Sequence, residues 1–140
     1  MIKGKTTQNK NQPDKVINWH NVTILIVEDD PLSMRFLYTI LTETQAKLVV
    51  AENGQDALNL VKQNDHIDLI LMDVQLPIMD GQEVTLKIRE FNTDIPIIAQ
   101  TAHAMPEDRA KCFESGCTDY ITKPIDIELL FNKISKYVNK

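Results

Sequence analysis

The stretch Leu69–Pro77, with the sequence L-I-L-M-D-V-Q-L-P, decides the fold of this chain. Its first four residues are apolar and predict a short strand that is buried on both faces, because a half-exposed strand alternates apolar and polar residues. The strand runs directly into Asp73, and Pro77 closes the turn that follows. A lone aspartate in such a place is usually a turn former or a cap, so this stretch alone does not assign a function.

The composition is that of a soluble globular domain. The chain has 140 residues, enough for one domain with a full core, and 43% hydrophobic with 25% charged residues argue against disorder in the body. No apolar run approaches the roughly 20 residues that span a bilayer. The polar, Lys-rich start does not resemble a secretory signal. We therefore expect a cytoplasmic location and no membrane contact by this segment.

Charge and composition divide the chain into two parts. Residues 1–20 hold four lysines and one aspartate, a charge of +3, so the remainder carries −8 of the total of −5. A body this acidic argues against direct nucleic-acid binding. We interpret residues 1–20 as a flexible leader or linker and residues 21–140 as the folded domain. Trp19 is an exception in the leader, because its ring could fold back on the domain or pack on a neighbouring one.

Five apolar runs alternate with segments whose apolar residues have helical spacing. The expected strands are Thr23–Val27, Lys47–Ala51, Leu69–Asp73, Ile95–Ala99 and Tyr120–Thr122. Helices are expected after Pro31, after Asn53-Gly54, after Asp80-Gly81, from Pro106 to Gly116, and over residues 127–138. Nearly continuous apolar strands between helices predict an α/β fold with a parallel sheet covered on both faces. The commonest five-stranded form is the doubly wound, flavodoxin-like order 2-1-3-4-5, with its ligand crevice at the carboxyl ends of the first and third strands.

Polar groups follow four of the strands, and the carboxyl ends of parallel strands share one edge of the sheet. Glu28 and Asp29 follow the first strand, Asp73 ends the third, and Thr101 and Lys123 follow the fourth and fifth. Like charges about 4 Å apart repel by about 4 kcal/mol at an effective dielectric near 20, so the three carboxylates need raised pKa values or a cation. Oxygen ligands with room for water suit Mg²⁺. The sequence therefore predicts a magnesium site at this edge.

The residue types at this edge suit phosphoryl transfer, which needs an in-line nucleophile and neutralisation of the phosphoryl oxygens. Asp73 would attack phosphorus and form an acyl phosphate, Mg²⁺ and Lys123 would take up the charge, and the Thr101 hydroxyl would bond one oxygen. Each residue alone has an ordinary interpretation: Asp30, for example, is better explained as a helix cap. Their joint occurrence at the ends of four strands makes the prediction specific.

Four successive blocks of the chain match those of one protein family. The blocks are V-E-D-D-P at 27–31, L-M-D-V-Q-L-P-I-M-D-G at 71–81, P-I-I-A-Q-T-A at 96–102 and D-Y-I-T-K-P at 119–124. In their order and spacing, the chain from about Thr23 to Val138 resembles a response-regulator receiver domain of two-component signalling. The second block and T-A-H-A-M at 101–105 resemble the subgroup that is fused to, or serves, hybrid histidine kinases.

The resemblance implies a role for each matched residue of the acidic site. Asp73 is then the phosphoacceptor. Asp29, Asp73 and the backbone carbonyl of Gln75 ligate Mg²⁺, and Glu28 reaches the ion through water. Lys123 bridges to the phosphoryl group, and its bond to the following proline is typically cis.

A conformational switch is implied as well. Thr101 binds the phosphoryl group with its hydroxyl and forms the switch pair with Tyr120. As the hydroxyl moves toward the phosphate, the ring turns inward and alters the face made by the fourth helix, the fifth strand and the closing helix. Gln75 and His103, next to the site, are candidates for tuning the reaction rate.

The expected phosphodonor is a histidine kinase or a histidine phosphotransfer protein, and a second copy of this chain is a further candidate partner. Such a domain is a signalling phosphoacceptor and not an enzyme, because it catalyses only its own phosphorylation and slow autodephosphorylation. A haloacid-dehalogenase-like phosphatase is one alternative, but it needs an acidic residue where this chain has Gln75. A pseudo-receiver that acts only as an interaction module is another, although it normally lacks one of the groups present here.

Overall fold

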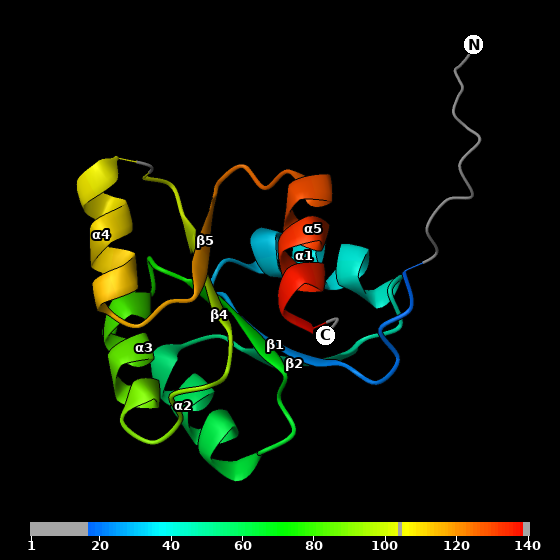
Figure 1. Cartoon of the computed structure of the whole chain (residues 1–140), viewed down its shortest axis with the longest axis horizontal. Coiled ribbons are helices and arrows are strands. Elements are labelled where there is room, and N and C mark those ends of the chain that lie inside the picture. The colour runs from blue at the N-terminus through cyan, green and yellow to red at the C-terminus, as the bar shows by residue number, and fades with distance from the viewer. Residues whose placement is uncertain (1–16, 104, 139–140) are drawn as a thin grey trace.

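The computed structural model describes residues 17–103 and 105–138, and this part of the chain has the expected α/β fold (Figure 1). The strands are β1 (Thr23–Val27), β2 (Lys47–Ala51), β3 (Leu69–Asp73), β4 (Ile97–Thr101) and β5 (Asp119–Thr122). The helices are α1 (Pro31–Thr42), α2 (Gly54–Gln63), α3 (Gly81–Arg89), α4 (Pro106–Glu114) and α5 (Ile127–Val138). None of these described helices is long and apolar enough to cross a bilayer.

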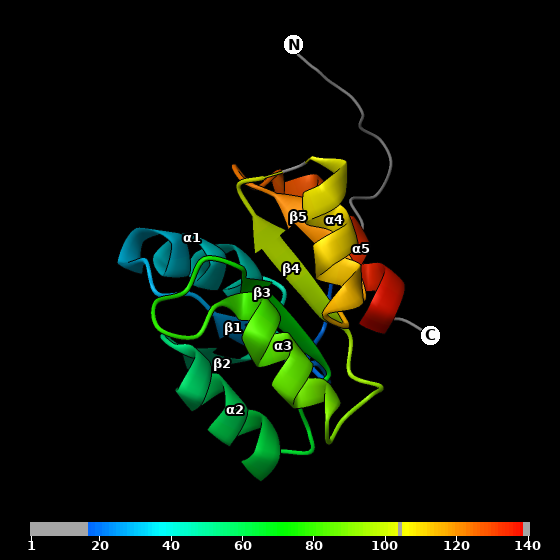
Figure 2. The same ribbon diagram turned by 90° about the vertical axis from the view of Figure 1, so that its left-hand side faces the viewer.

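All strand pairs are parallel, and the strand order is β2-β1-β3-β4-β5, as predicted. Figure 1 shows α1 and α5 on one side of the sheet and α2, α3 and α4 on the other, with α2 beside α3 in Figure 2. The strands need apolar residues on both faces because each face supports its own core. Leu71 of β3, for example, lies in the core under α1 and α5, while Met72 lies in the core under α2 and α3.

The start of β4 differs from the prediction. The strand begins at Ile97 and not at Ile95, because neither of the two preceding residues can donate to the ladder. The backbone N–H of Ile95 donates to the side chain of Asn92 at 3.1 Å, and Pro96 has no N–H. The strand instead continues to Thr101, whose carbonyl accepts a hydrogen bond from the backbone of Lys123 at 2.8 Å. Apolar character alone therefore placed this strand two residues too early.

Trp19 folds back on the domain, which is one of the two alternatives left open by the sequence. Its ring is 3% exposed, lies in the core under α1 and α5, and meets the Phe131 ring of α5 edge-on at 5.7 Å. Its backbone N–H donates to the carbonyl of Thr44 at 2.7 Å. Ile17 and Trp19 thus pack on the domain, whereas residues 1–16 of the proposed leader lie outside the described residues.

Candidate functional site

Three carboxylates meet at the carboxyl ends of β1 and β3. One oxygen from each of Glu28, Asp29 and Asp73 lies within 4.8 Å of the others. Glu28 and Asp73 are only 1% and 2% exposed, while Asp29 is open to solvent. The next residue, Asp30, accepts the backbone N–H of Ser33 at 2.9 Å and so caps α1, as predicted. The sheet therefore concentrates three acidic side chains at one edge, where Asp29 faces solvent.

Lys123 is the cation that this cluster contacts. It follows β5, and its Nζ lies 3.2 Å from Asp73 Oδ1 and 3.4 Å from Glu28 Oε1. Burial opposes the charge on Lys123, but the neighbouring Asp73 and Glu28 carboxylates outweigh burial and raise its pKa. The peptide bond between Lys123 and Pro124 is cis, as the family resemblance implied.

The cluster retains excess negative charge, because among the described residues Lys123 is the one ammonium in ion-pair contact with it, and it contacts only two of the three carboxylates. Burial, together with the hydrogen bond and charge of the neighbouring Asp73, raises the pKa of Glu28 to about 7. A proton on Glu28 or a bound cation would relieve the same repulsion. Oxygen donors from three side chains, one of them facing water, match the preference of Mg²⁺ for carboxylate and water ligands. The residues present therefore fit a magnesium ion.

Gln75 lies beside the cluster on the loop after β3. Its backbone N–H donates to Asp73 Oδ1 at 3.1 Å and thereby helps to fix the carboxylate. Its side-chain amide nitrogen lies 3.3 Å from Nε2 of His103, on the loop after β4. The structure thus brings together the two residues that the sequence suggested for rate tuning. Their contact joins the loops that follow neighbouring strands.

The hydroxyl of Thr101 is engaged by the backbone of the loop after β4. It accepts the N–H of His103 at 3.0 Å and donates to the carbonyl of His103 at 3.2 Å. Thr101 is 4% exposed and ends β4 one position beyond Gln100, which pairs with Asp73 in the sheet register. The hydroxyl is therefore at the predicted edge of the sheet, but in this structure it bonds the loop.

The predicted partner of Thr101, Tyr120, lies on β5 and is half-buried. Its hydroxyl accepts a hydrogen bond from Arg109 Nη1 at 3.2 Å, and its ring meets that of Phe113 edge-on. Both partners belong to α4, so Tyr120 contacts the helix that the family resemblance associates with a conformational switch.

Two residues at the site were not identified from the sequence. Gly81 was read only as part of a turn, yet a Cβ at this position would collide with the backbone carbonyl of Asp73. Gln100 is 1% exposed, and its side-chain nitrogen has no hydrogen-bond partner among the described residues. Two sequence features could have pointed to these residues: a glycine at the first position of a helix, and a glutamine in an otherwise apolar strand.

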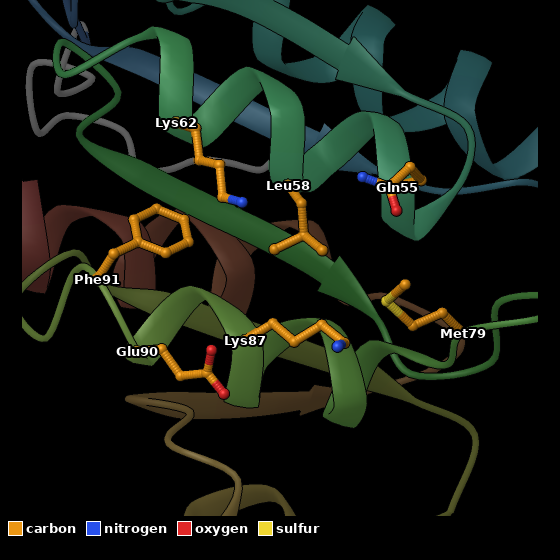
Figure 3. Close-up of a pocket in the computed structure, with 7 residues that line it drawn as sticks. All are labelled: Gln55, Leu58, Lys62, Met79, Lys87, Glu90 and Phe91. Carbon is orange, nitrogen blue, oxygen red and sulfur yellow. The ribbon is translucent and has the colours of Figure 1, made fainter.

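A separate cavity of about 230 Å³ lies between α2 and α3. Figure 3 shows Lys62 pointing from α2 toward α3, while the side chain of Lys87 runs along α3, and both residues line the cavity. The Lys62 ammonium lies 5.5 Å from the centre of the Phe91 ring. No residue of the acidic cluster lines this cavity, so the strand-end chemistry does not extend to it.

Comparisons with known proteins show what this chain is similar to. A family model described as "Response regulator receiver domain" matches residues 24–135. Sensor histidine kinase GacS of Pseudomonas protegens is 35% identical over 133 residues, which cover 91% of this chain and 14% of that protein. Sensor histidine kinase RcsC of Escherichia coli K12 is 34% identical over 128 residues, which cover 91% of this chain and 13% of that protein. The chain thus spans only a small part of these relatives.

Solved structures show the same architecture. One matching structure contains the receiver domain of Ssk1 from Saccharomyces cerevisiae, crystallised with the histidine phosphotransfer protein Ypd1. The match has a TM-score of 0.79 and 33% identity, and it covers 84% of this chain and 88% of the matched chain. The receiver domain of histidine kinase PA1611 from Pseudomonas aeruginosa matches with a TM-score of 0.79 and 30% identity, covering 86% and 99%. That structure contains a magnesium ion in its active-site cleft. With its family model covering residues 24–135, this chain belongs to the response regulator receiver domain family.

Proposed function

We propose that this domain accepts a phosphoryl group on Asp73 from a phosphohistidine donor, in a Mg²⁺-dependent step of a two-component phosphorelay. The observation that carries the proposal is the environment of Asp73. Its carboxylate is buried, contacts the Lys123 ammonium at 3.2 Å and lies within 4.8 Å of two further carboxylates. This environment supports the proposed roles of Asp73 as nucleophile, of Lys123 as neutralising cation and of the carboxylates as metal ligands at one edge of the sheet.

The chemistry follows from these positions. A carboxylate oxygen of Asp73 forms a bond to phosphorus as the bond from phosphorus to the donor imidazole breaks, and the imidazole leaves with the electron pair. Lys123 already contacts Asp73 Oδ1, so it stays beside the acyl phosphate and offsets the charge on its oxygens. Glu28 through water, together with Asp29, Asp73 and the carbonyl of Gln75, would hold a Mg²⁺ ion that supplies further charge neutralisation.

The proposed switch involves Thr101, which bonds the His103 backbone in this structure, and Tyr120, which bonds Arg109. Thr101 exchanges its bonds to the His103 backbone for a phosphoryl oxygen, and Tyr120 turns inward and leaves Arg109. These movements change the surface formed by α4, β5 and α5. The contact between Gln75 and His103 limits the access of water to the acyl phosphate and so tunes its lifetime.

The surface beside Lys123 supports docking of a histidine-bearing protein. Leu32 and Phe36 of α1 are apolar and 76% and 40% exposed. With Pro124 and Ile125 they line a cavity of about 450 Å³ that Lys123 also borders. A partner seated on these apolar side chains would bring its phosphohistidine to the neighbouring Asp73. We propose a histidine kinase or a histidine phosphotransfer protein as this partner. Separately, we propose a second copy of the chain as a candidate partner in a homodimer, not as a phosphodonor.

We further propose that the domain is a cytoplasmic signalling acceptor and not an enzyme, and that it does not bind nucleic acid. A phosphatase with a strand-end aspartate would need an acid–base group at the position of Gln75, whose amide cannot transfer a proton. The acidic body of the chain disfavours contact with a phosphate backbone.

Labelling with acetyl phosphate tests the proposal. Incubation with Mg²⁺ should phosphorylate the unmodified protein, and chelation of Mg²⁺ should prevent it. Asp73→Asn should abolish the label. Asp30→Asn is the matched control, because it removes a neighbouring carboxylate yet keeps a side chain that caps α1, and it should retain the label. Label that persists in Asp73→Asn and disappears in Asp30→Asn would refute the assignment.

A further inference from the structure

The ring of Tyr120 is held from the α4 side by two residues one helical turn apart. The Phe113 ring meets it edge-on with the centroids 6.1 Å apart. The guanidinium carbon of Arg109 lies 5.9 Å from the centre of the Tyr120 ring, and Arg109 Nη1 donates to the tyrosine hydroxyl at 3.2 Å. One side chain thus contacts both the ring and its hydroxyl. Positions four residues apart share a helix face, so both contacts come from the same side of α4.

The Tyr120 ring is also contacted by a residue of α5. The Lys133 ammonium lies 5.7 Å from the centre of the Tyr120 ring and is itself fixed by Asp119 Oδ1 at 3.0 Å. The Tyr137 hydroxyl donates to the other oxygen of Asp119 at 2.9 Å. Lys133 therefore has a carboxylate partner that remains when the ring moves. Arg109 differs, because its described hydrogen bond is to the tyrosine hydroxyl itself.

We propose that Arg109 is a positioning residue that holds Tyr120 at the surface between α4 and α5 and thereby opposes the change that follows phosphorylation of Asp73. This inference rests on the proposed function, in which Tyr120 turns inward. Inward rotation breaks the hydrogen bond from Arg109 Nη1 and removes the ring from the guanidinium. Arginine suits this task because its planar group can contact an aromatic ring and donate a directed hydrogen bond together.

The consequence follows from linkage between the two ends of the switch. A contact present only in the resting arrangement lowers the population of the inward one, and it therefore weakens binding of anything that favours the inward arrangement. Arg109 is exposed, so its contact with the ring is of the weaker, solvated kind. Removing the Arg109 side chain should shift the equilibrium between the resting and inward arrangements of Tyr120 by about two- to fivefold, toward the inward one.

Beryllofluoride, which takes the place of a phosphoryl group on a carboxylate, is the probe. With Mg²⁺ present, Arg109→Ala should bind beryllofluoride about two- to fivefold more tightly than the unmodified protein. Lys111→Ala is the matched control, because it removes a positive charge from the same helix without touching the contacts described for Tyr120, and it should not change the affinity. Arg109→Lys keeps the charge, and its affinity for beryllofluoride should lie between those of Arg109→Ala and Lys111→Ala.

A double-mutant cycle separates positioning from a general effect on α4. In Tyr120→Phe, which keeps the ring and loses the hydroxyl, Arg109→Ala should produce a smaller gain. The ring resonances of Tyr120 should also shift toward their beryllofluoride-bound positions in unliganded Arg109→Ala. Equal affinities of Arg109→Ala and Lys111→Ala, or the full gain in Tyr120→Phe, would overturn the inference. Failure of the unmodified protein to bind beryllofluoride would instead count against the proposed function.

Discussion

Lys123 Nζ lies 3.2 Å from Asp73 Oδ1, although 50 positions separate the two residues in sequence. Asp73 ends β3, Lys123 follows β5, and β4 lies between these strands. The contact can therefore form only when all three strands are aligned with their carboxyl ends together. Assembly of the sheet and assembly of the site are the same event.

Magnesium should stabilise the folded domain, because the unfolded chain does not hold three carboxylates together. We expect Mg²⁺ to raise the melting temperature, and Asp73→Ala to lose most of this increase. Thermal scans with and without Mg²⁺ measure the effect, with Asp30→Asn as a control that keeps the response. An unmodified protein whose melting temperature ignores Mg²⁺ would count against the metal site.

Gly81→Ala should damage the site through the backbone. The added Cβ would meet the carbonyl of Asp73, which cannot move without displacing the end of β3. We expect a loss of about 1–3 kcal/mol in the free energy of unfolding, typical of overpacking, together with a weaker Mg²⁺ response. Urea unfolding and thermal scans measure the two effects.

Gly54→Ala is the control for that variant, because Gly54 also begins a helix. There the nearest atom is Cγ2 of Val84, at the end of a side chain on α3. This variant should lose stability while keeping its Mg²⁺ response. Equal Mg²⁺ responses in the two alanine variants would show that Gly81 does not position Asp73.

Asp119 should contribute stability that depends on pH. Burial alone would raise its pKa, but hydrogen bonds from Lys133, the Tyr120 backbone and Tyr137 outweigh burial and lower the pKa below 3.8. Its contribution is therefore complete above this value and is lost as the pH falls through the folded-state pKa. Asp119→Asn should cost about 1 kcal/mol at pH 7, and the difference from the unmodified protein should shrink in acid.

Urea unfolding at several pH values checks this expectation. Asp65→Asn is a suitable comparison, since the Asp65 side chain is 93% exposed and its substitution should have little effect. A loss in Asp119→Asn that grows as the pH falls would have the wrong sign.

Trp19→Ala should destabilise the domain strongly, because the ring is buried against Phe131. Truncation of a buried tryptophan typically costs about 3–5 kcal/mol, and Trp19→Phe should cost less since it keeps an aromatic ring. Trp19 is the one tryptophan in the chain, so its fluorescence also reports unfolding of this region in the unmodified protein. A stability unchanged by Trp19→Ala would show that the ring does not belong to the core in solution.

The strands and the acidic edge could be predicted because local patterns determine them. β3 has the predicted bounds, since a continuous apolar run ending in Asp73 has few alternatives. Contacts between distant segments leave weaker signals. The burial of Trp19 depends on Phe131, and the need for glycine at position 81 depends on a carbonyl that only the folded chain brings near. The predicted start of β4 was wrong because hydrogen bonding, and not hydrophobicity, determines where a ladder begins.

The identity of the phosphorylated residue is the most direct test of the proposed function. Borohydride reduces an aspartyl phosphate to homoserine, which peptide mass spectrometry can locate in the chain. After treatment with acetyl phosphate and Mg²⁺, we expect homoserine at position 73 and at no other acidic residue. Homoserine at position 29 or 30, with Asp73 unmodified, would contradict the role of Asp73 as the phosphoacceptor.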